Sequence, residues 1–98
     1  MDLGLAAKVR PCLVLSVSPS DMDRALVTLV PHTTSLRESR FEVAFSVPFL
    51  RTGAFDAQNL VTVPNAKLLR SLGKLSAAQL KDVEAKVSIW LGLTPKSA

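Results

Sequence analysis

Short apolar runs, separated by turn residues and prolines, constrain this chain more than any other feature. Residues 11–17 and 25–31 are rich in β-forming side chains, and the segment Ser-Pro-Ser-Asp at 18–21 between them is typical of a turn. Residues 40–47 alternate apolar and polar side chains, and residues 59–63 form one more short apolar run. The first three-quarters of the sequence therefore predicts several short strands.

The strands are expected to differ in burial. Residues 11–17 show no polar alternation before Ser16, which favours a strand buried on both faces. The run 25–31 is expected to end at Pro31, with a polar loop over 32–40. In the run 40–47 one face is predicted to carry Phe41, Val43, Phe45 and Val47, and the other face to carry Arg40, Glu42, Ala44 and Ser46.

A single helix is predicted at the end of the chain. Ser76 followed by Gln79 forms a capping box, and Gly92 and Pro95 mark the end of the helix. The apolar residues between them recur at helical spacing: Leu80, Val83, Val87, Trp90 and Leu91. Residues 65–72 fit a helical turn, a strand or both. Several short strands followed by one helix predict a mainly β fold, a small barrel or curled sheet with the helix covering an open side.

Composition narrows the class of protein. The 98 residues suffice for one domain, 1–98, and 48% of them are apolar, which is enough for a packed core. The net charge of +4 is compatible with a nucleic-acid partner. Cys12 is the only cysteine, which fits a reducing compartment, and neither a secretion signal nor a membrane span is seen. We expect a cytoplasmic protein.

Five short motifs occur in order along the chain. They are Arg-Pro-Cys-Leu-Val-Leu-Ser at 10–16, Pro-His-Thr at 31–33, Phe-Glu-Val at 41–43, Gly53 with Gln58, and Leu-Gly-Lys-Leu-Ser at 72–76. Each motif alone is weak, but together the set resembles the MazF/PemK family of toxin endoribonucleases over about 2–93. The resemblance implies a small SH3-like barrel of the CcdB/MazF type with a C-terminal helix.

Two departures from the family pattern are visible. The first strand of the family, which begins with Gly-Asp, has no counterpart before Arg10, so the barrel is expected to be incomplete at its N-terminus. Some members also use an acid directly before the residue that matches Gln58. Here that position is Ala57, and Asp56 lies one residue out of step, on the opposite face of a strand. We therefore carry no acid role over to Asp56.

The resemblance assigns the catalytic roles to Arg10 and Thr33. RNA supplies its own nucleophile, the 2′-OH, so the enzyme has to stabilise the crowded phosphorane and needs no metal or other cofactor. A cation and a hydrogen-bonding hydroxyl perform the electrostatic part. Arg10 stays protonated, which favours charge stabilisation over general-base catalysis. Seen without the family, each of these residues reads as an ordinary residue at the end of a strand.

Further contacts with RNA are expected around this pair. The candidates are Thr34, Ser35, Arg37, Arg40 and Gln58. The only histidine, His32, is an obvious acid–base residue from its chemistry, but strand alternation directs it away from Thr33. The His and Cys residues show no metal-ligand spacing, so no metal site is expected.

The resemblance further implies the partners and leaves alternatives open. It implies a toxin of a type II toxin–antitoxin system that cleaves single-stranded RNA, including mRNA, sequence-selectively. It also implies a homodimer whose RNA groove spans both subunits and is occupied by an extended segment of a cognate antitoxin. One alternative is a CcdB-like toxin that binds gyrase, and another is an inactive truncated remnant.

Overall fold

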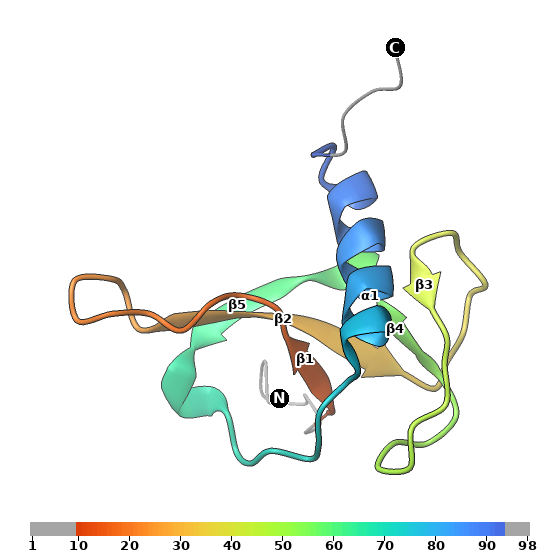
Figure 1. Ribbon diagram of the computed structural model, residues 1–98, viewed down its shortest axis with the longest axis horizontal. Helices are drawn as coiled ribbons and strands as arrows, with labels where there is room; N and C mark the ends of the chain where they lie inside the picture. The colour runs from red at the N-terminus through yellow and green to blue at the C-terminus, as the bar shows by residue number, and fades with distance from the viewer. Residues whose placement is uncertain (1–9, 94–98) are drawn as a thin grey trace.

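The computed structural model describes residues 10–93, which form a curved antiparallel sheet and one long helix (Figure 1). In chain order the elements are β1 (Cys12–Val14), β2 (Leu26–Thr33), β3 (Glu42–Val43), β4 (Ala54–Asp56), the 3-10 turn η1 (Ala57–Asn59), β5 (Val61–Pro64), the 3-10 turn η2 (Asn65–Lys67) and α1 (Ala77–Trp90). The expected succession of short strands and a final helix is confirmed.

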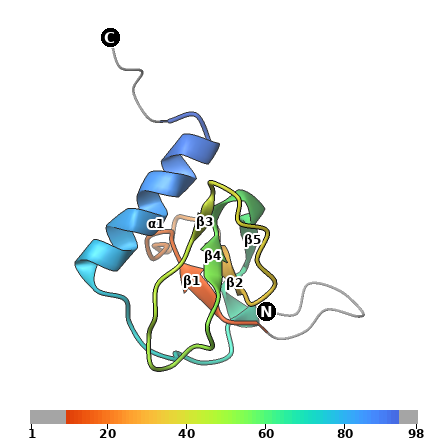
Figure 2. The same cartoon turned by 90° about the vertical axis from the view of Figure 1, so that its right-hand side faces the viewer.

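Strand β2 is the centre of the sheet. Along one edge β2 pairs with β1. Along the other edge its first half pairs with β5 and its last two residues pair with β4. Strand β4 pairs in turn with β3. Leu29 shows the arrangement directly, because it lies opposite Val14 of β1 and also opposite Val61 of β5. Within residues 10–93 the sheet does not close into a barrel, and β1 and β3 end the strand order β1-β2-β4-β3 (Figure 2).

Helix α1 packs against the sheet through a narrow apolar stripe. Its two buried residues, Val83 and Val87, join a core made with β2, β3, β4 and η1, whose buried members are Val30, Phe41, Val43, Phe55 and Ala57. A second, smaller cluster of Val27, Leu29 and Val63 lies between β2 and β5. The helix therefore covers the β3–β4 side of the sheet, and Leu13 of β1 packs against the same core.

Both ends of α1 follow from local sequence. The Ser76 hydroxyl accepts a hydrogen bond from the Gln79 backbone N–H at 3.1 Å, and the Gln79 side chain accepts one from the Ser76 N–H at 2.9 Å. The predicted capping box is thus confirmed. At the other end Gly92 has φ +71°, and Leu93 N–H donates to the carbonyl of Ser88. This arrangement satisfies carbonyls that the helix leaves without partners.

The alternation at 40–47 predicts faces correctly but strand length wrongly. Phe41, Val43 and Val47 are buried, whereas Ala44 and Ser46 are exposed, as expected for alternating faces. Only Glu42–Val43 pairs with a neighbouring strand. Strand β4 is itself only three residues long, so the rest of the run has no ladder to join.

Two other expectations for the strands are wrong. The strand at 11–17 is not buried on both faces, because β1 lies at an edge and Val14 is 47% exposed. Strand β2 also does not end at Pro31 but continues to Thr33. Pro31 is tolerated because it lies between the β5 pairing, which stops at Leu29, and the β4 pairing, which starts at His32. At that position a missing N–H removes no ladder hydrogen bond.

Candidate functional site

The pairing of β1 with β2 places Arg10 across from Thr33. Cys12 lies opposite Pro31, and the backbone N–H of His32 donates to the carbonyl of Pro11 at 3.0 Å, which extends the register by one residue. Continued by one more residue, this register would set Arg10 beside Thr33. Side chains directly opposite each other in an antiparallel pair share a face. The structure therefore brings the two predicted catalytic residues to one end of β2.

His32 is directed away from this pair. It is 6% exposed and contacts Phe55 edge-on, with ring centroids 5.1 Å apart. Burial lowers the pKa of His32, since an imidazolium loses its hydration there. The alternation argument is confirmed, because His32 faces the interior while Thr33 stays partly exposed.

The Thr33 side chain is held by the turn that follows it. Its hydroxyl oxygen accepts a hydrogen bond from the Ser35 backbone N–H at 3.0 Å, which is a common way for a threonine to start a turn. Gly53, which directly precedes β4, lies close to Thr33 on the other side. A Cβ added at Gly53 would meet the Thr33 carbonyl and the His32 ring. Thr33 is therefore fixed by a neighbour on each side, and Thr34 and Ser35 lie exposed next to it.

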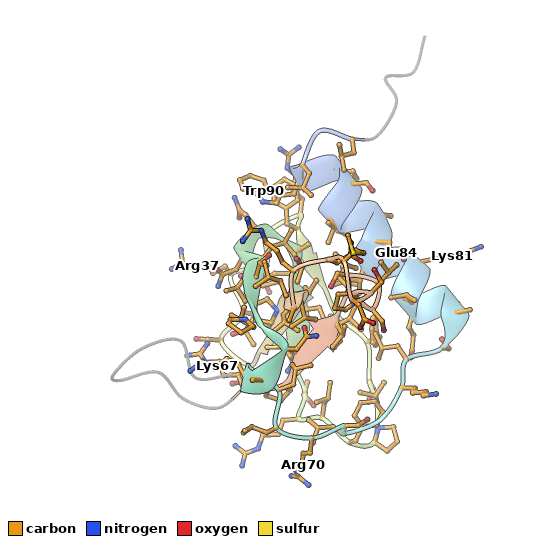
Figure 3. The ribbon with its side chains drawn as sticks, turned by 90° about the vertical axis from the view of Figure 1, so that its left-hand side faces the viewer. Arg37, Lys67, Arg70, Lys81, Glu84 and Trp90 are labelled. Carbon is orange, nitrogen blue, oxygen red and sulfur yellow. The ribbon has the colours of Figure 1, made fainter. Side chains whose placement is uncertain are left out.

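The loop after Thr33 is organised by Glu42, a residue that sequence reasoning did not single out. Its carboxylate accepts hydrogen bonds from the backbone N–H of Arg37 at 3.0 Å and from that of Ser39 at 3.2 Å. Glu42 is in β3, so the loop is attached to the far side of the sheet from β1. The Arg37 side chain is exposed on the outer surface (Figure 3). No local sequence pattern indicates this role of Glu42.

Arg40 and Gln58 each have neighbours of their own. The Arg40 guanidinium stacks 4.6 Å above the Phe41 ring, and Phe41 in turn contacts Trp90 of α1. Gln58 lies in η1, where its backbone N–H donates to the carboxylate of Asp56 at 3.1 Å. Asp56 therefore caps η1, which agrees with giving it no acid role. Gln58 was expected in a strand and lies in this turn instead.

A groove of about 550 Å³ begins at Arg10 and separates β1 from the segment that leads to α1. We name it the β1–linker groove. Its lining comes from β1 and its entry (Arg10, Pro11, Cys12, Val14), from the sheet interior (Leu50, Phe55), and from residues 67–73. Lys67 and Arg70 of this lining were not predicted as site residues. The only signal for them in the sequence was an excess of basic over acidic residues from position 67 onward.

The part of the chain that the structure describes gives no sign of thiol or metal chemistry. Burial raises the pKa of the Cys12 thiol, which disfavours a reactive thiolate. Among residues 10–93 no group of three or more His, Cys, Asp or Glu side chains is placed to hold a metal ion. No helix within the same residues has the length and apolar character needed to cross a membrane.

The chain is similar in sequence and in fold to known proteins. Residues 4–91 match the family described as PemK-like, MazF-like toxin of type II toxin–antitoxin system. An endoribonuclease in complex with its cognate antitoxin, from a mycobacterial species, superposes with a TM-score of 0.79 at 26% identity, covering 95% of this chain and 90% of that one. The Mycobacterium tuberculosis toxin MazF-mt6 gives a TM-score of 0.74 at 28% identity, covering 87% and 88%.

A MazE–MazF structure from Deinococcus radiodurans shares the fold, with a TM-score of 0.74 at 24% identity over 87% of each chain. No match was found among curated proteins. The matched residues include every motif from Arg10 to Ser76, and the match favours this family over the CcdB-like alternative. The chain therefore belongs to the PemK-like, MazF-like toxins of type II toxin–antitoxin systems.

Proposed function

We propose that this toxin is a metal-independent endoribonuclease that cleaves single-stranded RNA, including mRNA, sequence-selectively at the Arg10–Thr33 pair. The observation that carries the proposal is the β1–β2 register, which would bring the Arg10 cation opposite the Thr33 hydroxyl when it is continued past Pro11 and His32. Similar structures include a protein described as an endoribonuclease, which supports RNA as the substrate. The net charge of +4 suits a polyanion.

The reaction uses the RNA 2′-OH as the nucleophile. This oxygen loses its proton and attacks the adjacent phosphorus, the bond from phosphorus to the 5′-oxygen breaks, and the leaving oxygen takes up a proton. The products are a 2′,3′-cyclic phosphate and a 5′-hydroxyl. Arg10 and Thr33 stabilise the charge on the phosphorane oxygens, where preorganised donors have the largest effect on rate. Buried, neutral His32 is given no part in the proton transfers.

Thr34, Ser35 and Arg37 extend the RNA path from the pair along the exposed loop, and Arg40 and Gln58 contact RNA further away. We infer a homodimer, so that these distant residues can approach the Arg10–Thr33 pair of a second copy. We also infer a cognate antitoxin as partner, because a similar toxin is described in complex with one. The single cysteine fits a cytoplasmic site of action.

The experiment is cleavage of a mixed-sequence single-stranded RNA by the purified full chain in EDTA, with analysis of both new ends. The proposal expects cleavage in EDTA and products that carry 2′,3′-cyclic phosphate and 5′-hydroxyl ends. Cleavage that requires Mg²⁺ and leaves 5′-phosphates would contradict the 2′-OH mechanism. A folded protein that cleaves no RNA at any sequence would favour the inactive remnant instead.

Substitution of Arg10 tests the assignment of the cation. Arg10→Ala is expected to lower the single-turnover rate by roughly a hundred- to a thousandfold, the usual effect of removing one transition-state donor. Arg24→Ala is the matched control, since it removes the same charge from an exposed position to which no RNA contact is assigned. A folded Arg10→Ala protein with a near-normal rate would refute the role of Arg10.

A further inference from the structure

The loop between β2 and β3, residues 34–41, is held by a single carboxylate. Glu42, the first residue of β3, is half-buried, and one of its carboxylate oxygens accepts the backbone N–H groups of Arg37 and Ser39, each at 3.2 Å. The other oxygen accepts the Arg37 N–H at 3.0 Å, and the Ser39 carbonyl accepts the Glu42 N–H at 3.2 Å. Hydrogen bonds to a charged acceptor are roughly twice as strong as neutral ones, so Glu42 closes the end of the loop firmly.

Glu42 holds the loop in a conformation that this segment would not adopt readily by itself. Glu38, which lies between the two bonded N–H groups, has φ +57°, in the left-handed region of the backbone. Residues with a Cβ adopt this region rarely, and the surrounding interactions have to offset its cost. The bonds from Arg37 and Ser39 to Glu42, on either side of Glu38, do so. Without them we expect the loop to sample other conformations.

The place of Glu42 in the sheet does not itself favour an acid. Glu42 lies directly opposite Asp56 of β4. Like charges directly opposite each other on neighbouring strands repel, and glutamate is not a favoured residue in strands. The Asp56 carboxylate has a different task, because it accepts the Gln58 N–H at 3.1 Å. The bonds to the loop are therefore what an acid at position 42 contributes.

The loop that Glu42 fixes leads from the proposed reaction site to Arg37. It begins at Thr33, whose hydroxyl oxygen accepts the Ser35 N–H at 3.0 Å, and its other end is closed by Glu42. The Arg37 side chain is exposed and points outward from the molecule (Figure 3). A guanidinium on a fixed backbone loses less conformational freedom on binding a phosphate than one on a mobile loop. Glu42 thus prepares Arg37 for an anionic ligand without contacting that ligand.

We propose that Glu42 is a positioning residue for RNA, whose carboxylate holds the β2–β3 loop so that the Arg37 guanidinium binds a phosphate flanking the one that is cleaved. The proposal rests on the endoribonuclease function proposed above and adds to it a residue that touches neither the RNA nor the reacting atoms. Its effect has a diagnostic sign. Removing a negative charge near a polyanion ordinarily strengthens binding, whereas loss of the Glu42 carboxylate should weaken it.

The test is single-turnover cleavage of one RNA at varied protein concentration by the full chain, its Glu42→Gln variant and its Glu42→Ala variant. Concentrations are corrected for the folded fraction, measured by circular dichroism. The half-saturating concentration should rise roughly tenfold for Glu42→Ala, because the RNA must then order the loop. It should rise less for Glu42→Gln, whose carbonyl oxygen still accepts a backbone N–H. The rate at saturation should fall far less, because Thr33 is held by β2.

Glu38→Gln is the matched control, because it removes the same charge from an exposed residue of the same loop. Electrostatic repulsion alone would make both glutamine variants bind RNA more tightly than the wild type does. The proposal expects tighter or unchanged binding for Glu38→Gln and weaker binding for Glu42→Gln. Equal effects of the two substitutions, or tighter binding by Glu42→Gln, would overturn it.

Combination with Arg37→Ala shows whether Glu42 acts through Arg37. In the Arg37→Ala background, Glu42→Ala should raise the half-saturating concentration much less than it does in the wild type, because the contact that Glu42 prepares is already lost. An effect of full size in that background would contradict action through Arg37.

Amide hydrogen exchange of the free protein tests the loop without RNA. The N–H groups of Arg37 and Ser39 should exchange faster in Glu42→Gln than in the wild type, whereas that of His32 in β2 should not change. Unchanged exchange at Arg37 and Ser39 would overturn the positioning role. If the wild type cleaves RNA and Glu42→Ala binds RNA equally well, the positioning role alone fails. If the wild type neither binds nor cleaves RNA, the proposed function fails and this proposal fails with it.

Discussion

Gly53→Ala is expected to be among the most damaging single-methyl changes in this protein. Gly53 is buried directly before β4, and an added Cβ would lie 2.8 Å from Cε1 of His32 and 3.0 Å from the carbonyl carbon of Thr33, in addition to meeting the Thr33 oxygen. The Thr33 atoms are backbone, so no side-chain rotation relieves the clash. The ends of β2 and β4 must separate instead.

The cost follows from this geometry. Forcing one extra methyl into a packed site costs about 1–3 kcal/mol, and a clash with backbone belongs at the upper end, about 3 kcal/mol. A domain with a total stability of roughly 5–15 kcal/mol remains folded but is clearly weakened. Gly92→Ala is the matched control. Gly92 has φ +71°, and no atom lies within 4 Å of a Cβ added there. The only destabilisation expected for Gly92→Ala is therefore that of an alanine in the left-handed backbone region, about 1–2 kcal/mol.

The assay is urea unfolding followed by circular dichroism for the wild type and both alanine variants. We expect the free energy of unfolding to fall more for Gly53→Ala than for Gly92→Ala, with unchanged slopes. The folded fraction of Gly53→Ala should also cleave RNA more slowly, because Thr33 is displaced. A loss below about 0.5 kcal/mol at Gly53 would refute the close approach of this segment to β2.

Three further predictions concern stability. Ser76→Ala removes the cap of α1 and should cost about 1 kcal/mol in urea unfolding, whereas Ser71→Ala in the exposed linker should cost almost nothing. Val83→Ala, at a site with 0% exposure, should cost about 2 kcal/mol, and Val17→Ala, at 87% exposure, should not be measurable. Because burial lowers the pKa of His32 below its usual 6.5, protonation favours the unfolded state, so stability should fall as pH drops below about 6.5. The fall should be smaller in His32→Gln, and an equal pH dependence of unfolding would contradict the role of His32.

The helix could be predicted in detail because its signals are local. Ser76 and Gln79 are three residues apart, and the buried Val83 and Val87 are one turn apart, so the cap and the centre of the buried stripe are both readable from the sequence. The predicted stripe extended too far, because Trp90 is 41% and Leu91 50% exposed. The faces of the run 40–47 were readable for the same reason. Its pairing was not, because the length of β3 depends on the three residues available in β4.

Pro31 shows why strand ends are harder to predict. A proline usually stops a strand, but it is harmless where a strand exchanges one neighbour for another, and only the tertiary arrangement reveals that β2 does so. The position of Arg10 relative to Thr33 was anticipated from the family motifs, and the β1–β2 register is compatible with it. The β1–linker groove was not anticipated, because it joins residues near position 12 to residues near position 70.

The central claim is that Arg10 and the hydroxyl of Thr33 act on one phosphate. The most direct test is the single-turnover rate of cleavage of one RNA by Thr33→Val and Thr34→Val, each also combined with Arg10→Ala. Valine keeps the shape and β-propensity of threonine, so circular dichroism should show intact folding. The account predicts a loss of roughly a hundredfold for Thr33→Val, little for Thr34→Val, and a smaller further loss when Thr33→Val is added to Arg10→Ala. A normal rate for Thr33→Val, or a loss confined to Thr34→Val, would contradict it.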